Sequence, residues 1–306
     1  RCGGCNWQHI DYSEQLVQKQ LIVKEQLRNV ITSETDILEI SPSPQPLRYR
    51  NRIQLKYNNG SLGFFARKSH QIIDINDCLI CEEPLALEIP ELKKRLASGN
   101  ESSIDKIEIK LVNAGQQTKV ETVIGAALQE AAGFSQVNRF QNEKLVSRVL
   151  QIVESSSAKE VYDLYAGAGN FTFPILSKIH GIKMISVELS ELLVQEANKK
   201  IKSLNLGTQK IRYLLSDVET FLTKVIMGED SLVIIDPPRT GCSQVVIDKL
   251  AKQKCAQIIY ISCNPSTLAR DLQRLSQQGM WKVKSVQAFD MFPQTDHIET
   301  LVELTR

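Results

Sequence analysis

The stretch Asp163-Leu-Tyr-Ala-Gly-Ala-Gly-Asn170 decides the fold of this chain, because an apolar run ends in it and a glycine turn follows. The run itself, Glu160–Tyr165, is short and nearly continuous, as expected of a strand that is covered on both faces. Glycine residues in such a turn let the backbone pass close to a ligand. We therefore expect a strand that ends at a ligand-binding turn and leads into a helix.

Apolar and helical segments alternate on both sides of this turn. Further strands are predicted at Met184–Glu188, Ser231–Asp236, Ala256–Ser262, Val283–Phe289 and Glu299–Leu304, with helices such as Leu192–Leu204 and Val245–Lys254 between the earlier ones. This alternation predicts an α/β fold with a Rossmann-like, doubly wound and mostly parallel sheet. We assign this sheet to a domain that covers residues 134–306.

Residues 1–133 follow a different pattern, and we expect them to form a smaller α+β domain. Arg52–Tyr57 alternates between apolar and polar residues, Asn58-Asn-Gly60 forms a turn, and Ser61–Phe65 returns, which predicts a β-hairpin. A helix is predicted near the start of the chain. Its apolar residues recur at a roughly helical period and are Leu16, Val17, Leu21, Ile22 or Val23, and Leu27.

Composition limits the possible functions. The chain has 306 residues, 24% charged residues and a net charge of +2, which argues against a polybasic tail but allows a local basic face. The seven cysteines are an odd number in a chain of intracellular type, so metal or catalytic roles are favoured over a disulfide framework. We find no signal-peptide pattern and no apolar run of about 18 residues, and expect a monomeric, cytoplasmic protein. The first residue is Arg rather than Met, so further residues are expected before it.

Acidic residues at two later strand ends indicate the type of cofactor. Glu188 ends the second strand, where a carboxylate can hold a ribose diol, and Asp217 follows the third strand, where it could contact an adenine edge. No third glycine stands at dinucleotide spacing, because Phe171 and Thr172 follow Asn170. S-adenosylmethionine has no pyrophosphate and needs only one glycine turn, so it is favoured over a dinucleotide. The alternative is that the glycine residues only form a tight turn.

Two further strand ends carry candidate reactive groups. Asp236-Pro-Pro-Arg-Thr-Gly241 resembles the turn of amino-group methyltransferases, but Arg239 replaces the aromatic residue that stacks on the base there. This difference argues against methylation of an exocyclic amine. Cys263 ends the next strand among the polar or turn-forming residues Ser262, Asn264 and Pro265, so its thiol is expected to face a cleft. The alternative is a small buried cysteine without reactivity.

A thiol is needed if the methyl acceptor is C5 of uracil, which is a poor nucleophile. Addition of a thiolate at C6 produces an enolate with electron density on C5, and a base must later remove the C5 proton so that the thiol can leave. The segment Phe289–Glu299 offers three candidate bases, which are Asp296, His297 and Glu299. The residues alone do not choose among them.

Five motifs in this order resemble the RNA uracil-C5 methyltransferases, the family that forms 5-methyluridine in ribosomal and transfer RNA. The motifs are Phe134-Ser-Gln-Val-Asn138, Asp163–Phe171, Asp236–Gly241, Ser262-Cys-Asn-Pro265 and Met291–Glu299. The resemblance implies a class I methyltransferase domain, Cys263 as the nucleophile and Glu299 as the base. The cofactor-binding positions that it implies are Gln136, Tyr165, Asn170, Glu188, Asp217 and Asp236.

The first residues resemble the iron–sulfur members of this family, which act on 23S ribosomal RNA. Cys2-Gly-Gly-Cys5 and the downstream Cys78 match three ligands of a 4Fe-4S cluster, while the family's first ligand and its small RNA-binding β-barrel would lie before residue 1. The cluster is then incomplete in this chain, or Cys81 substitutes, or the chain is a piece of a longer protein. A zinc site on Cys2, Cys5, Cys78 and Cys81 is the alternative.

RNA contact is expected from arginine and lysine residues with interleaved aromatics, which suit phosphates and single-stranded bases. These are Arg48-Tyr-Arg-Asn-Arg52, Lys56, Phe64, Phe65, Arg67 and Lys68. An ordinary solvated strand face is the alternative. The target uridine must leave its stack to reach the thiol. Other hypotheses are a transfer RNA substrate, methylation of an amine or a protein side chain, and an iron–sulfur RNA-binding module with an inactive methyltransferase fold.

Overall fold

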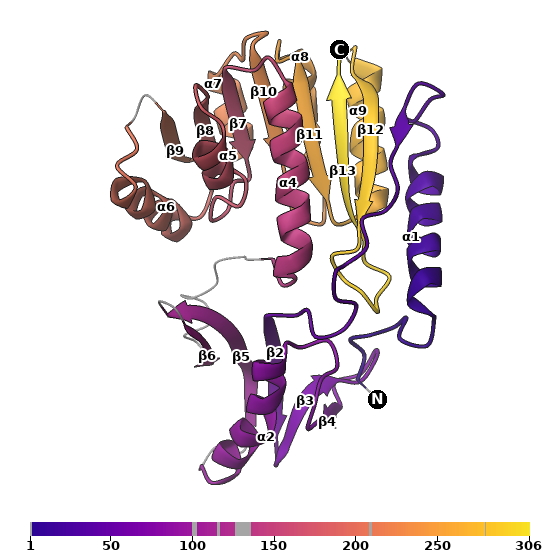
Figure 1. Ribbon diagram of the computed structural model, residues 1–306, viewed down its shortest axis with the longest axis vertical. Coiled ribbons are helices and arrows are strands. Elements are labelled where there is room, and N and C mark those ends of the chain that lie inside the picture. Colours follow the sequence, from indigo (N-terminus) through magenta and orange to yellow (C-terminus); the bar gives the residue numbers. More distant parts are fainter. Residues whose placement is uncertain (1, 100–102, 115–116, 126–135, 208–209, 279) are drawn as a thin grey trace.

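The computed structural model describes residues 2–99, 103–114, 117–125, 136–207, 210–278 and 280–306. Within these ranges the chain forms two sheets (Figure 1). The eight-stranded sheet lies in the upper half of the view and the five-stranded sheet in the lower half. The predicted boundary between residues 133 and 134 lies outside the described residues, so the two-domain division stays a prediction.

The large sheet has a parallel core. Its five parallel strands, in spatial order, are β9 (Ile211–Leu215), β8 (Lys183–Glu188), β7 (Glu160–Leu164), β10 (Ser231–Ile235) and β11 (Gln257–Ser262). The strand order changes direction between β7 and β10, and the carboxyl ends at such a point are the usual ligand site of doubly wound sheets. The predicted α/β class and parallel sheet are confirmed.

An antiparallel strand completes the sheet. β13 (Glu299–Thr305) runs antiparallel between β11 and β12 (Lys282–Phe289), and the short β1 (Asp36–Ile37) pairs in parallel with β12. Because β13 is antiparallel to β11, its first residue lies at the edge where β11 ends. This edge is also where the glycine turn follows β7.

Helices cover both faces of the large sheet. One hydrophobic core joins the sheet to α1 (Tyr12–Leu27), α7 (Val218–Lys224), α8 (Gln244–Lys252) and α9 (Pro265–Gln278). A second core joins its other face to α4 (Arg139–Ser155), α5 (Thr172–Lys178) and α6 (Glu191–Ser203). Both faces are therefore buried, which explains why the parallel strands are nearly continuous apolar runs.

The small sheet is antiparallel. Its spatial order is β4 (Ile72–Asp74), β3 (Ser61–Phe65), β2 (Arg52–Asn58), β5 (Ser103–Ala114) and β6 (Gln117–Ile124), and α2 (Glu83–Ala97) packs on it through a third core. The predicted hairpin is confirmed by the pairing of β2 with β3. Asn59 and Gly60 form its turn with φ of 46° and 82°. Glycine adopts such a positive φ without the strain that a side chain would cause.

Helix α1 forms where the sequence predicts a helix, but it buries a different face. Val17 and Leu21 are 51% and 52% exposed. The buried residues are Gln15, Lys19, Val23 and Leu27, spaced four apart along one face. The helix packs beside α9 and β12 of the large sheet, so the start of the chain contributes to that sheet's layers. Among the described helices, none is long and apolar enough to cross a membrane.

Candidate active site

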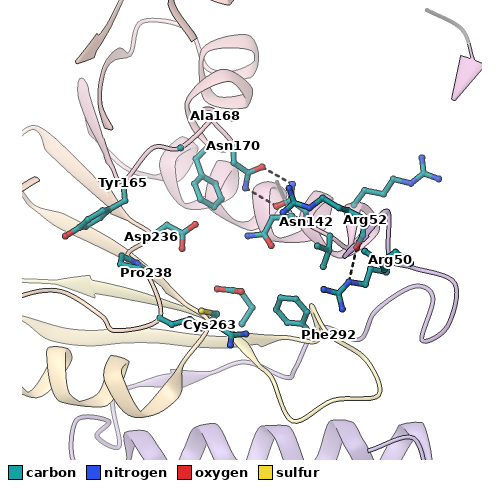
Figure 2. A pocket seen from close by; sticks show the side chains of 18 of the residues that line it. Arg50, Arg52, Asn142, Tyr165, Ala168, Asn170, Asp236, Pro238, Cys263 and Phe292 are labelled. Atoms are coloured by element: carbon teal, nitrogen blue, oxygen red, sulfur yellow. Dashed lines mark hydrogen bonds between the residues drawn. The ribbon is translucent and has the colours of Figure 1, made fainter. Parts of the chain in front are cut away.

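A cavity of about 1170 Å³ opens at the carboxyl edge of β7, β10 and β11 (Figure 2). One wall is the glycine turn after β7, and another is made by the ends of β10, β11 and β13. The facing wall belongs to β2, β3 and the cysteine-rich start of the chain. Ligand pockets typically have volumes of about 300–1,000 Å³, so this space is large enough for more than one small ligand.

The glycine turn needs its glycine residues. Tyr165, Gly167 and Gly169 have φ of 62°, 57° and 84°. A Cβ atom on Gly169 would lie 2.5 Å from the Phe173 ring, so a side chain there would force the ring to move. Tyr165 adopts the left-handed region although it is not glycine, which is a strained conformation often found at functional sites.

The Glu188 carboxylate is held beside this turn. It accepts the backbone N–H of Gly167 at 2.9 Å and that of Ser190 at 2.7 Å. The Tyr213 hydroxyl donates to the Gly167 carbonyl at 2.7 Å and ties the turn to β9. A fixed carboxylate at this strand end can accept the two hydroxyl groups of a ribose.

The side chain of Asn170 makes a reciprocal amide pair with Asn142 on α4. The two hydrogen bonds measure 2.9 Å and 3.0 Å and appear as dashed lines in Figure 2. Both residues line the cavity, as does Gln136, whose carbonyl accepts the Asn51 amide at 3.3 Å. Sequence reasoning missed Asn142, because a single Asn inside a helix carries no signal of its own.

Five of the six expected cofactor residues line this cavity. They are Gln136, Tyr165, Asn170, Glu188 and Asp236. The sixth, Asp217, is exposed, is not among the lining residues and caps helix α7 by accepting the Thr220 N–H at 2.7 Å. The structure therefore shows Asp217 as the cap of α7 and does not place it on the cavity wall.

Strand pairing brings Cys263 beside Glu299. Ser262 of β11 pairs with Thr300 of β13, so Cys263 and Glu299 are the next residues on the two neighbouring strands. Both line the cavity. Glu299 is 3% exposed, whereas Cys263 is half-buried. Figure 2 shows Cys263, Asp236 and Phe292 around the same space, with Arg50 and Arg52 beyond Phe292.

The electrostatics of these groups are linked. Burial and the Glu299 carboxylate raise the pKa of the Cys263 thiol, while the nearby Arg239 guanidinium lowers that pKa. Burial and the Asp236 carboxylate raise the pKa of Glu299 well above its usual range, and Arg239 opposes this shift as well. Burial, with a contribution from Asp163, raises the pKa of Asp236 to about 7. A carboxyl group whose pKa is raised toward neutrality is suited to proton transfer near neutral pH. For the Cys263 thiol the upward shift has the opposite effect, because it lowers the fraction of thiolate at that pH.

Of the three candidate bases, Glu299 alone is among the residues that line the cavity. The ring of His297 packs edge-on against Phe292 at 5.9 Å, and burial lowers the pKa of this histidine. Asp296 is exposed, and its backbone N–H donates to Asn6 at 3.1 Å. The geometry therefore favours Glu299 for chemistry at the cavity and gives the other two roles within the loop.

The expected cluster ligands Cys2, Cys5 and Cys78 line the facing wall of the same cavity. Burial, with smaller contributions from Cys78 and Cys2, raises the pKa of the Cys5 thiol to about 11. Cys81 is buried and shares a side-chain hydrogen bond with Cys78, which lowers the pKa of Cys78 to about 6. Within the described ranges, no group of three or more His, Cys, Asp or Glu residues is arranged to hold a metal ion.

The expected RNA-contacting residues are divided between the cavity and the surface. Arg50, Arg52 and Phe64 line the cavity. Arg48 makes a two-pronged ion pair with Asp77 at 2.8 Å, and Lys56 pairs with Asp105 at 2.9 Å. Arg67 and Lys68 are exposed near the end of β3. The basic residues thus lie on the cavity wall, in ion pairs, and in the exposed segment that follows β3.

Comparisons with known proteins agree on one family. The model of the tRNA (uracil-5-)-methyltransferase family matches residues 99–306. An uncharacterized RNA methyltransferase of Bdellovibrio bacteriovorus is 45% identical over 99% of this chain and 77% of its own length. The 23S rRNA (uracil(1939)-C(5))-methyltransferase of Pseudomonas fluorescens is 29% identical over 98% of this chain and 76% of its own length.

A solved structure is similar to the chain along nearly its whole length. It is the tRNA (uracil-54, C5)-methyltransferase of Pyrococcus abyssi in complex with S-adenosyl-L-homocysteine. The TM-score is 0.78, the sequence identity is 22%, and the match covers 99% of this chain and 86% of that chain. At this identity the likeness shows a shared fold.

Proposed function

The chain belongs to the tRNA (uracil-5-)-methyltransferase family, and from this premise we propose that it methylates C5 of a uridine in 23S ribosomal RNA through a covalent bond between Cys263 and C6. One observation carries the proposal. Cys263 and Glu299 lie next to each other at the ends of β11 and β13, in the cavity that the glycine turn also lines.

The cavity residues suit S-adenosylmethionine. We assign its binding to Gln136, Tyr165, Asn170, Glu188 and Asp236, which surround the turn after β7. The assignment is supported by the fixed Glu188 carboxylate and by the absence of a dinucleotide glycine pattern. A role for Asp217 stays a prediction, because this residue caps α7 outside the cavity lining. When bound, the cofactor supplies an electrophilic methyl group on a sulfonium.

The reaction then follows from the positions of two side chains. The Cys263 thiolate adds to C6 of uracil, so that a carbon–sulfur bond forms and the ring becomes an enolate with electron density on C5. C5 then attacks the sulfonium methyl group, so that a carbon–carbon bond forms, the sulfur–methyl bond breaks and S-adenosylhomocysteine would leave as a neutral thioether. The Glu299 carboxylate removes the proton from C5, the C5–C6 double bond forms again, and the Cys263 thiolate leaves. Glu299 can take this proton only when it is ionised.

The RNA class is the finer part of the proposal. The Pseudomonas fluorescens relative is named for a uridine of 23S ribosomal RNA, which supports ribosomal RNA as the substrate. The alternative, transfer RNA, is supported by the solved structure that shares the fold. Arg50, Arg52 and Phe64 line the outer part of the cavity, where nucleotides next to the target would pass.

We also propose that Cys2, Cys5 and Cys78 hold a 4Fe-4S cluster, with a further ligand outside these three. The proposal is supported by their shared place on one wall and by the electrostatic effect of Cys2 and Cys78 on Cys5. The zinc alternative would need the buried Cys81 as well.

The covalent step can be tested with RNA that carries 5-fluorouracil at the target. The fluorine on C5 cannot leave as a proton, so a protein–RNA adduct should accumulate and survive a denaturing gel. Cys263→Ala should form no adduct, whereas Cys255→Ala, at a fully buried cysteine outside the cavity lining, should form it normally. An adduct with Cys263→Ala would show that the nucleophile is a different residue.

A further inference from the structure

The loop between β12 and β13 connects two parts of the active site. It begins with Asp290, directly after Phe289, and Phe289 pairs with Glu299 at the end of the β12–β13 ladder. It also carries Phe292, whose ring lines the cavity (Figure 2). The placement of this loop therefore determines the surroundings of Glu299 and one wall of the space for the target base.

Helix α1 holds this loop through a buried lysine. The Lys19 ammonium donates to Asp290 Oδ1 at 2.6 Å and to the Phe292 carbonyl at 3.1 Å. The side chains of Lys19 and Asp290 are both 0% exposed. One lysine thus binds the residue next to the Phe289–Glu299 pair and the backbone of the cavity residue Phe292.

Gln15, one helical turn before Lys19, holds the middle of the loop. Its Oε1 accepts the Gln294 N–H at 2.9 Å, and its Nε2 donates to Gln294 Oε1 at 3.1 Å. Gln294 has a φ of 69°, a conformation that is strained for a residue with a side chain. The two hydrogen bonds from Gln15, one to the backbone and one to the side chain of Gln294, offset this strain and favour one loop conformation.

Two further side chains bind the loop from other parts of the chain. The Tyr49 hydroxyl donates to the Pro293 carbonyl at 3.0 Å, and the Asn138 amide donates to the Met291 carbonyl at 3.2 Å. The Phe292 carbonyl accepts a hydrogen bond from Lys19, so the three successive carbonyl groups of Met291, Phe292 and Pro293 each have a side-chain donor. The backbone of this segment is therefore fixed residue by residue.

A buried ion pair is a costly way to stabilise a fold. Burial removes both charges from water, and well-packed apolar residues in their place are often equally or more stable. The same face of α1 continues with Val23 and Leu27, which pack in the apolar core. This face of α1 is thus polar where it meets the loop between β12 and β13 and apolar beyond it. The polar residues Gln15 and Lys19 therefore suit a role in specifying the geometry of that loop.

We propose that Lys19 is a positioning residue for the methyl-transfer site, which fixes the loop so that Glu299 reaches the C5 proton of the bound uracil. The proposal rests on the proposed function, because it assumes that Glu299 is the base. Lys19 itself does not line the cavity. Its partner Asp290 directly follows Phe289, which pairs with Glu299, whereas Cys263 is positioned by the end of β11. The effect of Lys19 should therefore fall on the proton-removal step, which needs Glu299, more than on the addition of Cys263 to C6.

The test separates these two steps in Lys19→Met. The rate of adduct formation with 5-fluorouracil RNA reports addition and methyl transfer and should stay within about twofold of the wild-type rate. On ordinary RNA, turnover should fall at least about tenfold with little change in KM, since misplacing a catalytic group by about 1 Å can cost 10²-fold. A covalent complex of protein, RNA and one methyl group should accumulate in this variant. The control Lys24→Met removes an exposed lysine of the same helix and should behave as wild type.

A double variant separates positioning from simple stabilisation. Lys19→Met leaves the buried Asp290 carboxylate without its cation, which should lower the unfolding temperature. Lys19→Met combined with Asp290→Asn removes both charges and should recover most of that stability. The hydrogen bond to the Phe292 carbonyl remains lost, so the slow turnover and the trapped complex should persist.

Three outcomes would decide against the proposal or its premise. If turnover recovers together with stability in the double variant, Lys19 has only a structural role. If Lys19→Met slows adduct formation as much as turnover and traps no methylated complex, the lysine does not act through Glu299. If the wild-type protein forms no adduct with 5-fluorouracil RNA, the proposed function itself is wrong.

Discussion

The ionisation of Cys263 leads to a prediction about the pH dependence of the covalent step. Only the thiolate is nucleophilic, and an ordinary cysteine with a pKa of about 8.5 is about 3% ionised at pH 7. Burial and Glu299 raise the pKa of Cys263, so its ionised fraction at pH 7 is smaller still. Below that pKa the fraction increases about tenfold per pH unit. The rate of adduct formation with 5-fluorouracil RNA should therefore rise about tenfold per unit between pH 6 and 8.

Removal of Arg239 should shift this profile. The guanidinium lowers the pKa of Cys263, so Arg239→Gln should raise that pKa and lower the rate at pH 7. Arg239 is largely exposed, and solvent screening limits its effect, so we expect a decrease of about two- to tenfold. The rate at high pH, where the thiol is fully ionised, should be nearly unchanged.

The assay is single-turnover adduct formation on denaturing gels from pH 6 to about 10.5, a range meant to include the pH at which the rate levels off, with wild type, Arg239→Gln and Arg212→Gln. Arg212 is an exposed arginine of β9 that does not line the cavity, so its variant should follow the wild-type profile. A rate that does not depend on pH would contradict the raised pKa of Cys263. If the Arg239→Gln rate levels off at the same pH as the wild-type rate but at a lower value, Arg239 acts in RNA binding rather than on the ionisation of Cys263.

Two further predictions concern the base and the cysteine-rich wall. Glu299→Gln keeps the size of the side chain but removes its basicity, so it should lower turnover by about 10²–10⁴-fold and trap a methylated covalent complex on ordinary RNA. Mass spectrometry identifies that complex, and an adduct without the methyl group would place Glu299 in an earlier step. The control His297→Asn should turn over nearly normally. Anaerobically purified protein should contain iron and sulfide and show broad visible absorbance that is lost in Cys2→Ser, Cys5→Ser and Cys78→Ser but kept in Cys81→Ser. One zinc and no sulfide in metal analysis would decide for the four-thiolate zinc site.

Most of the large sheet is predictable from the sequence because local patterns determine it. Strands buried on both faces are apolar runs, and β7 and β10 lie within one residue of their predicted bounds. The turn after β7 is evident in the sequence from its two glycine residues, and the structure explains Gly169, which has a positive φ and where a Cβ atom would lie 2.5 Å from the Phe173 ring. The carboxyl ends of parallel strands meet at one edge, so the sequence alone places Glu188, which ends β8, and Asp236, which follows β10, at the same site.

Helix α1 shows where a local pattern is insufficient. The leucine period predicts a buried apolar face, but Leu21 is exposed while Gln15 and Lys19 are buried. Nothing in the helix sequence reveals the partners of these polar residues, so the pattern places them on the solvent side. Asp290, the partner of Lys19, lies 271 residues away along the chain. Buried polar contacts of this kind depend on tertiary structure alone.

The choice of the base depends on tertiary structure in the same way. Asp296, His297 and Glu299 are close in sequence and have plausible chemistry, so the residues alone do not separate them. The cavity lining includes only Glu299 of the three, which is the first residue of β13, whereas Asp296 and His297 lie in the preceding loop and are not among the lining residues. Asp217 illustrates the opposite case, since its position after a parallel strand suggests a ligand contact but its carboxylate caps α7.

The direction of β13 explains how the base and the nucleophile meet. In a wholly parallel sheet the first residue of a strand lies at the edge opposite the ligand site. Because β13 runs antiparallel to β11, its first residue, Glu299, lies at the edge where β11 ends and Cys263 follows. The residues after Glu299 belong to β13, and the sheet holds them in place. The residues before Glu299 belong to a loop, so the position of the base also depends on the conformation of that loop. The buried contacts of Lys19 and Gln15 fix that loop, so the precision of the proton-removal step should depend on helix α1 as much as on the sheet.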